Sequence, residues 1–233
     1  MRLGGPHLNL RFRAMGRYGT GGGRLLIPPV ITEPATQRLR RALRAQRMAL
    51  DARRQAEAAE RLKRRLVTLP VFRASRRVAC YLPNDGEIDP MPLIVQLWAA
   101  GKHCYLPVLS RLSRDRLWFA RYLPDTRLLN NRFGIPEPDV APRAWVRAQE
   151  LDLILMPLVG FDLDGNRLGM GGGFYDRSLD FLRRRRHWRK PRLIGLAHDF
   201  QRVDRLLPAP WDVPMQYVVT DRAIYPVAPE GRR

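Results

Sequence analysis

The stretch RLGMGGGFYD, residues 167–176, is where residue types and spacing most clearly offer chemistry. It holds four glycines within five positions, preceded by Arg167 and followed by an aromatic pair and Asp176. Glycine can adopt positive φ, and without a Cβ its amide can approach an anion closely. The pattern therefore indicates either a phosphate-binding loop or a plain glycine-rich turn before a helix.

The common nucleotide motifs do not fit this stretch. A Walker A loop needs Lys-Ser or Lys-Thr after its glycines, and neither pair follows here. In a dinucleotide fingerprint, Phe174 or Asp176 would occupy the place of the third glycine. The nearby DLDGN (162–166) lacks the third acidic position and the late glutamate of a calcium loop, so we interpret it as a turn.

The elements that must position the loop favour a phosphate. Residues 151–159 form a continuous apolar run that is typical of a buried parallel strand, and residues 174–186 are expected to form a helix. In open α/β sheets, ligands bind beyond the carboxyl ends of the strands, where amides and helix N-termini attract anions. Arg167 suits such a site as a charge-assisted donor.

Strands and helices alternate along most of the remaining chain. A first helix is expected from Thr32, with Leu39, Leu43 and Leu50 along one apolar stripe, and a second is expected after an Asp51 cap, with Ala58, Leu62 and Leu66 on its apolar face. A third helix is expected at 90–101. Strands are expected at 76–83, 102–109, 116–122, 191–198 and 216–225, and a loop at 123–138. This order predicts an α/β fold, a three-layer α/β/α sandwich with N-terminal helices and a mostly parallel central sheet covered on both faces.

Composition bounds the organisation of the 233 residues. We expect a single domain at 34–226, a basic and disordered extension at 1–33, and a short tail at 227–233. No apolar run approaches the roughly 18 residues of a membrane span. Cys80 and Cys104 sit in strand-like runs without zinc-site spacing, which predicts two reduced, buried thiols in a cytoplasmic protein.

The net charge of +20 is concentrated in three segments. Residues 1–32 contribute +5, residues 38–65 contribute +8 and the run RRRRHWRK (183–190) contributes +6. The rest of the chain is nearly balanced, so the charge belongs to a tail and two helical stretches rather than to one broad face. Solvated basic helices explain this pattern, and phosphate or nucleic-acid contact is the alternative.

Six ordered segments resemble the 5-formyltetrahydrofolate cyclo-ligases, also called methenyltetrahydrofolate synthetases, over about residues 38–222. The most characteristic is MPLVGFDLDGNRLGMGGGFYDRSL (156–179). The others are LRRALRAQRMAL (39–50), YLPNDGEID (81–89), LWFARY with NRFGIPEP (117–122 and 131–138), GLAHDFQ (195–201) and LPAPWDVPMQYVVT (207–220).

This resemblance implies an ATP-dependent ring closure of 5-formyltetrahydrofolate to 5,10-methenyltetrahydrofolate, with release of ADP and phosphate. In the mechanism implied, the formyl oxygen attacks the γ-phosphate, N10 of the folate then attacks the activated carbon, and phosphate leaves. The nucleophiles belong to the substrate, which agrees with the lack of a G-x-S-x-G elbow or an activated cysteine in the sequence. Such chemistry needs alignment of the reactants and neutralisation of phosphoryl charge by Mg²⁺, arginines and amides.

The resemblance also implies site residues. The ATP positions are Arg40, Arg44, Arg167, Leu168, Gly169, Met170, Gly171, Gly172, Gly173, Phe174 and Tyr175, of which Arg167 and Tyr175 are the expected catalytic residues; the folate positions are Leu82, Glu87, Met170 and Phe174; the Mg²⁺ positions are Asp176 and Asp212. Relatives often carry a lysine where this chain has Thr36 and Gln37, which leaves Arg38 or Arg41 as the candidate for the first phosphate contact.

Each of these residues also has a purely structural explanation. Glu87 could cap the helix that begins near Pro90, Asp176 could stabilise a helix start, and Asp212 could be a turn residue. For the whole chain, the alternatives are an RNA-binding protein that uses the basic segments, or a relative acting on another phosphorylated metabolite. The sequence lacks the signatures of the common RNA-binding modules. We expect small-molecule substrates only, no membrane, no requirement for nucleic acid, and a monomer.

Overall fold

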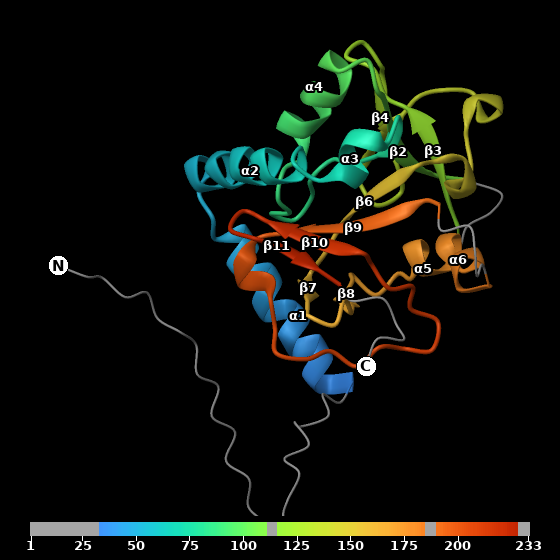
Figure 1. Cartoon of the computed structure of the whole chain (residues 1–233). Helices are drawn as coiled ribbons and strands as arrows, with labels where there is room; N and C mark the ends of the chain where they lie inside the picture. The colour runs from blue at the N-terminus through green and yellow to red at the C-terminus, as the bar shows by residue number, and fades with distance from the viewer. Residues whose placement is uncertain (1–32, 111–115, 185–189, 228–233) are drawn as a thin grey trace, which may run out of the picture. The chain divides into compact units, whose positions relative to one another are not determined.

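The structure, a computed structural model, describes residues 33–110, 116–184 and 190–227 (Figure 1). Residues 1–32 of the disordered extension expected at 1–33, the tail after Val227 and most of the basic run at 183–190 lie outside the described residues, whereas Glu33 is the first residue of α1. The helices are α1 (Glu33–Met48), α2 (Ala52–Leu66), α3 (Pro70–Ala74), α4 (Met91–Ala99), α5 (Phe174–Leu179) and α6 (Phe181–Arg184), with 3-10 turns at Pro142–Ala144, Ala148–Glu150 and Asp199–Gln201. The strands are β1 (Arg77–Ala79), β2 (His103–Leu109), β3 (Leu117–Arg121), β4 (Leu128–Asn130), β5 (Pro136–Pro138), β6 (Leu153–Pro157), β7 (Gly160–Phe161), β8 (Arg167–Leu168), β9 (Arg192–Ala197), β10 (Tyr217–Thr220) and β11 (Ile224–Pro226).

Seven strands form the central sheet, in the order β11-β10-β9-β6-β1-β2-β3. The five inner strands run parallel, and the two edge strands β11 and β3 pair antiparallel with their neighbours. Parallel strands all end at the same edge of a sheet, so the segments that follow β1, β6, β9 and β10 meet there. This edge carries the site described below.

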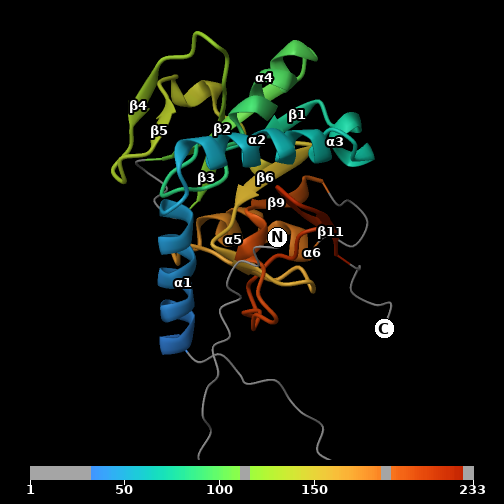
Figure 2. The same ribbon diagram turned by 90° about the vertical axis from the view of Figure 1, so that its left-hand side faces the viewer.

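Helices cover both faces of the sheet, which confirms the predicted three layers. Leu153 and Leu155 of β6 face one core with residues from α2, α3 and α4. Ile154 and Met156 face a second core with residues from α5 and α6. This alternation along one strand buries both faces, because successive side chains point to opposite sides. Figure 2 shows α2 lying across one face and α5 behind the sheet.

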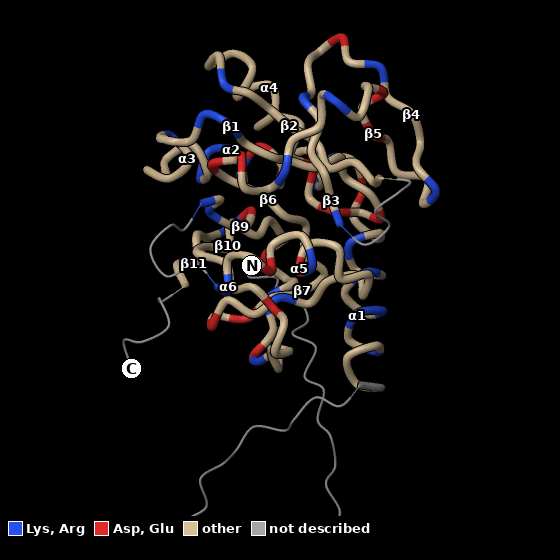
Figure 3. Tube along the Cα trace, turned by 90° about the vertical axis from the view of Figure 1, so that its right-hand side faces the viewer, with Lys and Arg blue, Asp and Glu red and all other residues tan. Residues whose placement is uncertain are grey.

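The two N-terminal helices form as their sequences predict. Asp51 caps α2 by accepting the Arg54 backbone N–H at 2.8 Å, a contact that stabilises a helix start by about 1 kcal/mol. Helix α1 ends at Met48, so Leu50 lies beyond it. Rather than covering a sheet face, α1 packs Leu43 onto the loops at the carboxyl edge. Arginines recur along α1, where Figure 3 shows them in blue.

The loop expected at 123–138 is wrong, because it contains the β4–β5 hairpin. Asn131 closes that hairpin: its Oδ1 accepts the backbone N–H groups of Phe133 and Ile135, and its Nδ2 donates to Glu137. Gly134 adopts φ of 75° in the same turn. This is turn chemistry of the Asn-x-x-Gly type, which can be recognised in a sequence only when the flanking strands are recognised too.

Two further elements are shorter than expected. The helix predicted at 174–186 is interrupted at Asp180, between α5 and α6. The Ser178 hydroxyl donates to Phe174 O and accepts the Leu117 N–H, a bond to its own helix that is known to bend helices. The strand predicted at 216–225 is a hairpin of β10 and β11, closed by Thr220 Oγ1, which accepts two backbone N–H groups.

The remaining expectations concern membrane and redox chemistry. Among the helices that the structure describes, none is long and apolar enough to cross a membrane. Cys80 and Cys104 are buried free thiols, as predicted. The cytoplasmic location, the monomeric state and the domain boundaries stay predictions.

Candidate functional site

A four-residue turn after β1 presents Glu87 at the carboxyl edge of the sheet. Asp85 and Gly86 both adopt left-handed backbone conformations, with φ of 55° and 71°. Non-glycine residues accept this conformation rarely, and Asp is among those that do. A Cβ at Gly86 would lie 2.7 Å from the backbone carbon of Arg47, so the turn docks closely on the end of α1. Within the turn, Asn84 N donates to Glu87 Oε2 at 3.2 Å.

Arg47, which the sequence analysis missed, holds this turn in place. Its side chain is 0% exposed. Nε donates to Asp85 O at 3.1 Å, Nη2 to Asp85 Oδ2 at 2.8 Å and Nη1 to Leu158 O at 3.0 Å, while Nη1 lies 3.9 Å from Glu87 Oε1. Arg44 adds a bidentate contact to Asp85, at 2.5 and 3.1 Å. Arg47 follows Arg44 by three residues, so helical spacing was the signal that could have found it.

Glu87 does not cap the helix that follows it. The helix-capping role that was an alternative for Glu87 is filled by Asp89, whose Oδ1 accepts the Met91 N–H at 2.8 Å. Leu82 is partly buried and packs against the core below the turn. The Glu87 carboxylate therefore does not cap α4, and its described contacts are the Asn84 N–H of its own turn and the Arg47 guanidinium.

Burial dominates the electrostatics of this turn. It raises the pKa of Glu87 to about 7, against the lowering effects of the Arg47 charge and the Asn84 N–H. The pKa of Tyr175 is also raised, first by burial and then by the Glu87 charge, which places the Tyr175 ring near the carboxylate. Burial lowers the pKa of His198 to about 4, so this neighbour adds no positive charge near neutral pH.

The glycine loop lies at the same edge of the sheet, but it does not follow β6 directly as expected. Strand β6 leads first into the small β7–β8 hairpin, closed by the Asp162 turn as predicted, and the exposed residues 169–172 then lead to Gly173 and α5. Gly171 and Gly173 adopt φ of 95° and 62°. Arg40 Nε on α1 donates to Gly169 O at 2.8 Å, so an arginine lies against the loop.

An aromatic contact joins the loop to a distant hairpin. Phe133, from the turn between β4 and β5, meets Phe174 edge to face with ring centroids 5.9 Å apart. Met170 lies exposed on the same loop, and Arg177 Nη2 donates to Gly172 O at 2.6 Å. No local pattern could have indicated Phe133, because 41 positions separate it from Phe174.

The predicted metal residues Asp176 and Asp212 lie close together. Arg167 donates to the Asp176 carboxylate and to Val213 O, and its side chain is largely buried. Burial and the nearby Asp212 charge raise the pKa of Asp176, against the Arg167 charge. Asp212 also serves its own turn, since its Oδ2 accepts the Ala209 N–H at 2.8 Å.

The predicted residues gather at one edge of the sheet. Tyr175 lies near both the Glu87 carboxylate and the Arg167 guanidinium, and Arg167 in turn contacts Asp176. Arg40 contacts the loop itself, whereas Arg44 contacts the turn that carries Glu87. Such an edge, with a buried carboxylate of raised pKa and a glycine loop flanked by arginines, can orient an amide-bearing ring against a phosphate chain.

Comparisons with known proteins identify the family of the chain. A sequence model described as the 5-formyltetrahydrofolate cyclo-ligase family matches residues 32–221. The Escherichia coli K12 protein named 5-formyltetrahydrofolate cyclo-ligase is 42% identical over 185 residues, which cover 78% of this chain and 98% of that protein. The protein of the same name from Haemophilus influenzae is 41% identical over 181 residues, covering 77% of this chain and 94% of that protein.

A solved structure is also similar. The NMR structure of Aquifex aeolicus 5,10-methenyltetrahydrofolate synthetase aligns with a TM-score of 0.70 at 32% sequence identity, covering 85% of this chain and 95% of that chain. The similarity therefore covers most of both chains.

Proposed function

The chain belongs to the 5-formyltetrahydrofolate cyclo-ligase family, and from this premise we propose how its residues divide the binding of the two reactants. Its function is the ATP-dependent cyclisation of 5-formyltetrahydrofolate to 5,10-methenyltetrahydrofolate, with release of ADP and phosphate. The proposal concerns which side chains hold the folate, which hold the ATP and where a metal ion would act.

The buried Glu87 carboxylate carries the proposal, as the group that binds the folate ring. The amino-pyrimidinone edge of the folate presents adjacent N–H donors, and one ionised carboxylate accepts two such donors together. Glu87 is 11% exposed and already faces a positive guanidinium at 3.9 Å, so its ionised form is available near neutral pH. Leu82, Met170 and Phe174 would cover the ring.

The glycine loop would hold the ATP phosphates. Residues 169–172 are exposed, and positive φ at Gly171 and Gly173 turns the backbone without a Cβ in the way. Arg40 already contacts the loop, so its guanidinium would need little movement to bind the phosphates. Arg44 would first have to leave Asp85, so we assign its main role to holding the Glu87 turn. Because α5 has only six residues, the loop amides and arginines contribute more than a helix dipole does.

A magnesium ion would fit at Asp176 and Asp212. No group of three or more His, Cys, Asp or Glu side chains in the described part of the chain could hold a metal alone. Two nearby carboxylates suit Mg²⁺, which commonly takes one or two carboxylates and completes its shell with phosphates and water. When bound, it would neutralise charge on the transferring phosphoryl group. Arg167, paired with Asp176, would move with that carboxylate and reach the same phosphate.

Catalysis then rests on positioning. Glu87 and the Arg47–Asp85 contact would fix the folate ring, and Tyr175 would lie between the ring and the loop. These contacts would direct the formyl oxygen at the γ-phosphate. Arg167 and the loop amides would stabilise the negative charge that develops on the transferring phosphoryl group. Tyr175 is protonated at neutral pH, as any tyrosine is, and burial raises its pKa further, so it would act as a hydrogen-bond donor.

An absorbance assay of methenyltetrahydrofolate formation with 5-formyltetrahydrofolate, ATP and Mg²⁺ tests the activity. Glu87→Gln should raise the KM for the folate about 10- to 150-fold, the cost of about 1.5–3 kcal/mol for losing hydrogen bonds to a charged group, and leave the KM for ATP unchanged. Arg40→Ala should raise the KM for ATP and spare the folate.

Arg64→Ala is the matched control, because it removes an exposed arginine from α2, away from the loop. It should behave as the wild type. If Glu87→Gln and Arg40→Ala each affect both substrates equally, the division of the site is wrong. If the wild-type protein forms no product that depends on ATP, the activity itself is wrong.

A further inference from the structure

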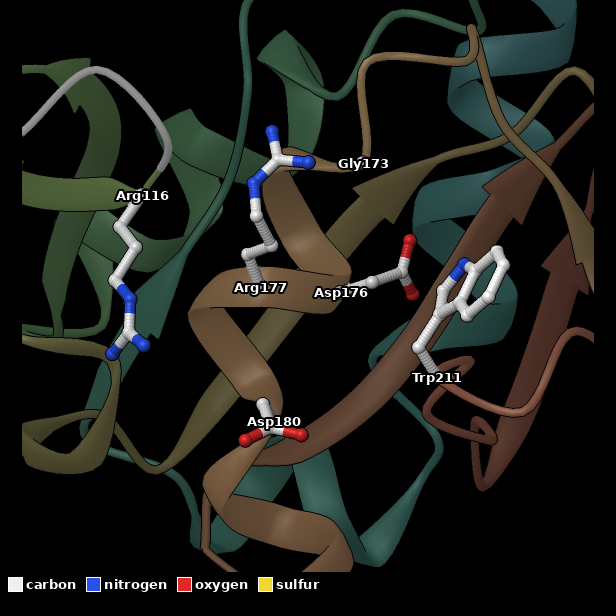
Figure 4. Close-up of a pocket in the computed structure, with 6 residues that line it drawn as sticks. All are labelled: Arg116, Gly173, Asp176, Arg177, Asp180 and Trp211. Atoms are coloured by element: carbon white, nitrogen blue, oxygen red, sulfur yellow. The ribbon is translucent and has the colours of Figure 1, made fainter.

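Two buried polar atoms at the carboxyl edge have no role in the site described above. The cavity over the start of α5, which Arg116, Asp176 and Trp211 help to line, includes a proposed metal residue and so belongs to that site (Figure 4). By contrast, His198 Nε2 and Gln55 Oε1 are buried and have no hydrogen-bond partner among the described residues. Buried polar groups are nearly always paired, so each exception needs a physical explanation.

The unpaired nitrogen of His198 is a hydrogen-bond donor. His198 is 2% exposed, and its side chain accepts the backbone N–H of Gln201 at the start of the 3-10 turn that follows β9. Because Nε2 has no partner, the nitrogen that accepts this N–H is Nδ1. Burial lowers the pKa of His198 to about 4, so the ring is neutral near pH 7. A neutral imidazole whose Nδ1 is an acceptor carries its proton on Nε2.

The turn that carries His198 is joined to the turn that carries Glu87. Gln201 Oε1 accepts the His198 backbone N–H at 2.8 Å, and Gln201 Nε2 donates to Leu158 O at 2.6 Å. Arg47, which holds the Glu87 turn, donates to the same Leu158 O at 3.0 Å. One carbonyl just after β6 therefore fixes both turns, which follow the two strands of the sheet on either side of β6.

The Gly86 carbonyl is the acceptor that His198 approaches. Gln55 Nε2 donates to Gly86 O at 3.1 Å and to Arg47 O at 3.4 Å, so the amide of Gln55 spans the end of α1 and the Glu87 turn. The Gly86 backbone also acts on the His198 ring, raising its pKa against the larger effect of burial, as a nearby acceptor does. A carbonyl oxygen accepts two hydrogen bonds, so Gly86 O can take the His198 Nε2–H beside Gln55.

This carbonyl governs the direction of the Glu87 side chain. The Gly86 C=O and the Glu87 N–H belong to one rigid peptide plane. The N–H donates to Asn84 O at 3.1 Å, and the C=O accepts Gln55. A bond from His198 would hold the same plane from the side of β9. An unpaired buried donor raises the free energy of the ligand-free protein, so a ligand that favours the paired arrangement of the turn binds more tightly.

We propose that His198 is a positioning residue for folate binding, whose Nε2–H donates to the Gly86 carbonyl when the folate occupies Glu87. The proposal rests on the proposed function, because the Glu87 turn matters to the reaction only if Glu87 holds the folate ring. His198 itself would touch neither substrate. It would act through the peptide that precedes Glu87.

NMR spectroscopy of the full-length wild-type protein tests the hydrogen bond directly. Long-range proton–nitrogen correlation spectra at neutral pH should show the His198 proton on Nε2. This proton should shift downfield when 5-formyltetrahydrofolate is added, because hydrogen bonding deshields it. A proton on Nδ1, or an Nε2–H signal that the folate leaves unchanged, overturns the proposal.

Two substitutions of His198 separate the roles of the two ring nitrogens. His198→Gln places an amide N–H near the position of Nε2, whereas the shorter side chain in His198→Asn keeps the capping acceptor and loses the distal donor. His198→Asn should therefore raise the KM for the folate about 5-fold or more above that of His198→Gln, which corresponds to about 1 kcal/mol or more. The KM for ATP should be the same in both variants. Both should unfold at similar urea concentrations, because both lose the ring.

His103→Asn is the matched control, because it makes the same substitution at a half-buried histidine at the start of β2, on the amino edge of the sheet. It should keep the wild-type KM for both substrates. If His198→Asn raises the KM for ATP as much as that for the folate, His198 is merely structural and the proposal is wrong.

The comparison with Glu87→Gln separates this inference from the proposed function. If Glu87→Gln raises the KM for the folate but His198→Asn and His198→Gln have equal KM values for it, only the role of His198 is wrong. If Glu87→Gln leaves the KM for the folate unchanged, the proposed role of Glu87 is wrong, and this inference fails with it.

Discussion

Glu87→Gln should stabilise the ligand-free protein, and the gain should depend on pH. The Glu87 carboxylate is largely buried, and holding its charged form away from water costs the folded state free energy. Glutamine has nearly the same shape and cannot ionise. The variant therefore removes the free-energy cost of burying a charge while keeping the packing of the turn.

The magnitude follows from the pKa of Glu87, which burial raises from 4.5 to about 7. A difference of about 2.5 units corresponds to roughly 3 kcal/mol, at about 1.4 kcal/mol for each unit. The sign is set by the raised pKa: the unfolded chain ionises first, so the wild type loses stability as pH rises from 4.5 to 7. The stability gain of Glu87→Gln over the wild type should grow over that window and stay constant above it.

Urea unfolding followed by circular dichroism at pH 5, 6, 7 and 8 measures this difference. Glu60→Gln on α2 is the control, since its side chain is 43% exposed and should show no such trend. A gain that does not change with pH would refute the reasoning. A gain that appears only in acid would show that the Arg47 charge, rather than burial, governs the pKa of Glu87.

Two further predictions concern the turn and the metal residues. Gly86→Ala should lower the free energy of unfolding by about 1–3 kcal/mol or more, because the added Cβ would lie 2.7 Å from the Arg47 backbone. Gly101→Ala is the control: Gly101 also has a positive φ, of 65°, but no atom lies within 4 Å of the added Cβ, so the loss should be only about 1 kcal/mol. Equal losses in urea unfolding would contradict the close approach at Gly86. Asp212→Asn keeps an oxygen that accepts the Ala209 N–H but loses the negative charge, so calorimetry should show weaker Mg²⁺ binding in the presence of ADP. Asp204→Asn, which changes an exposed residue in the same loop, is the control. An equal Mg²⁺ affinity in the two variants would show that Asp212 is not part of the metal site.

Much of the fold could be predicted because it depends on near neighbours. The Asp51 cap, the apolar run of β6 and the glycines before α5 are local features, and each is confirmed in the structure. The β4–β5 hairpin was missed because its strands are three residues long and pair mainly through the Asn131 turn. The family resemblance, confirmed by the relatives, supplied the site residues that local patterns alone would have left as turns and helix ends.

By itself, the sequence determined the α/β class, the family and the glycine loop, because these depend on periodicity, spacing and residue type along the chain. Only the tertiary structure decided that Arg47 holds the Glu87 turn, that Phe133 meets Phe174, and that residues 116, 176 and 211 line one cavity. These contacts arise because parallel strands from distant parts of the chain end at one edge of the sheet. Their order in the sheet, β9-β6-β1, is not their order in the sequence, and it chooses which loops become neighbours.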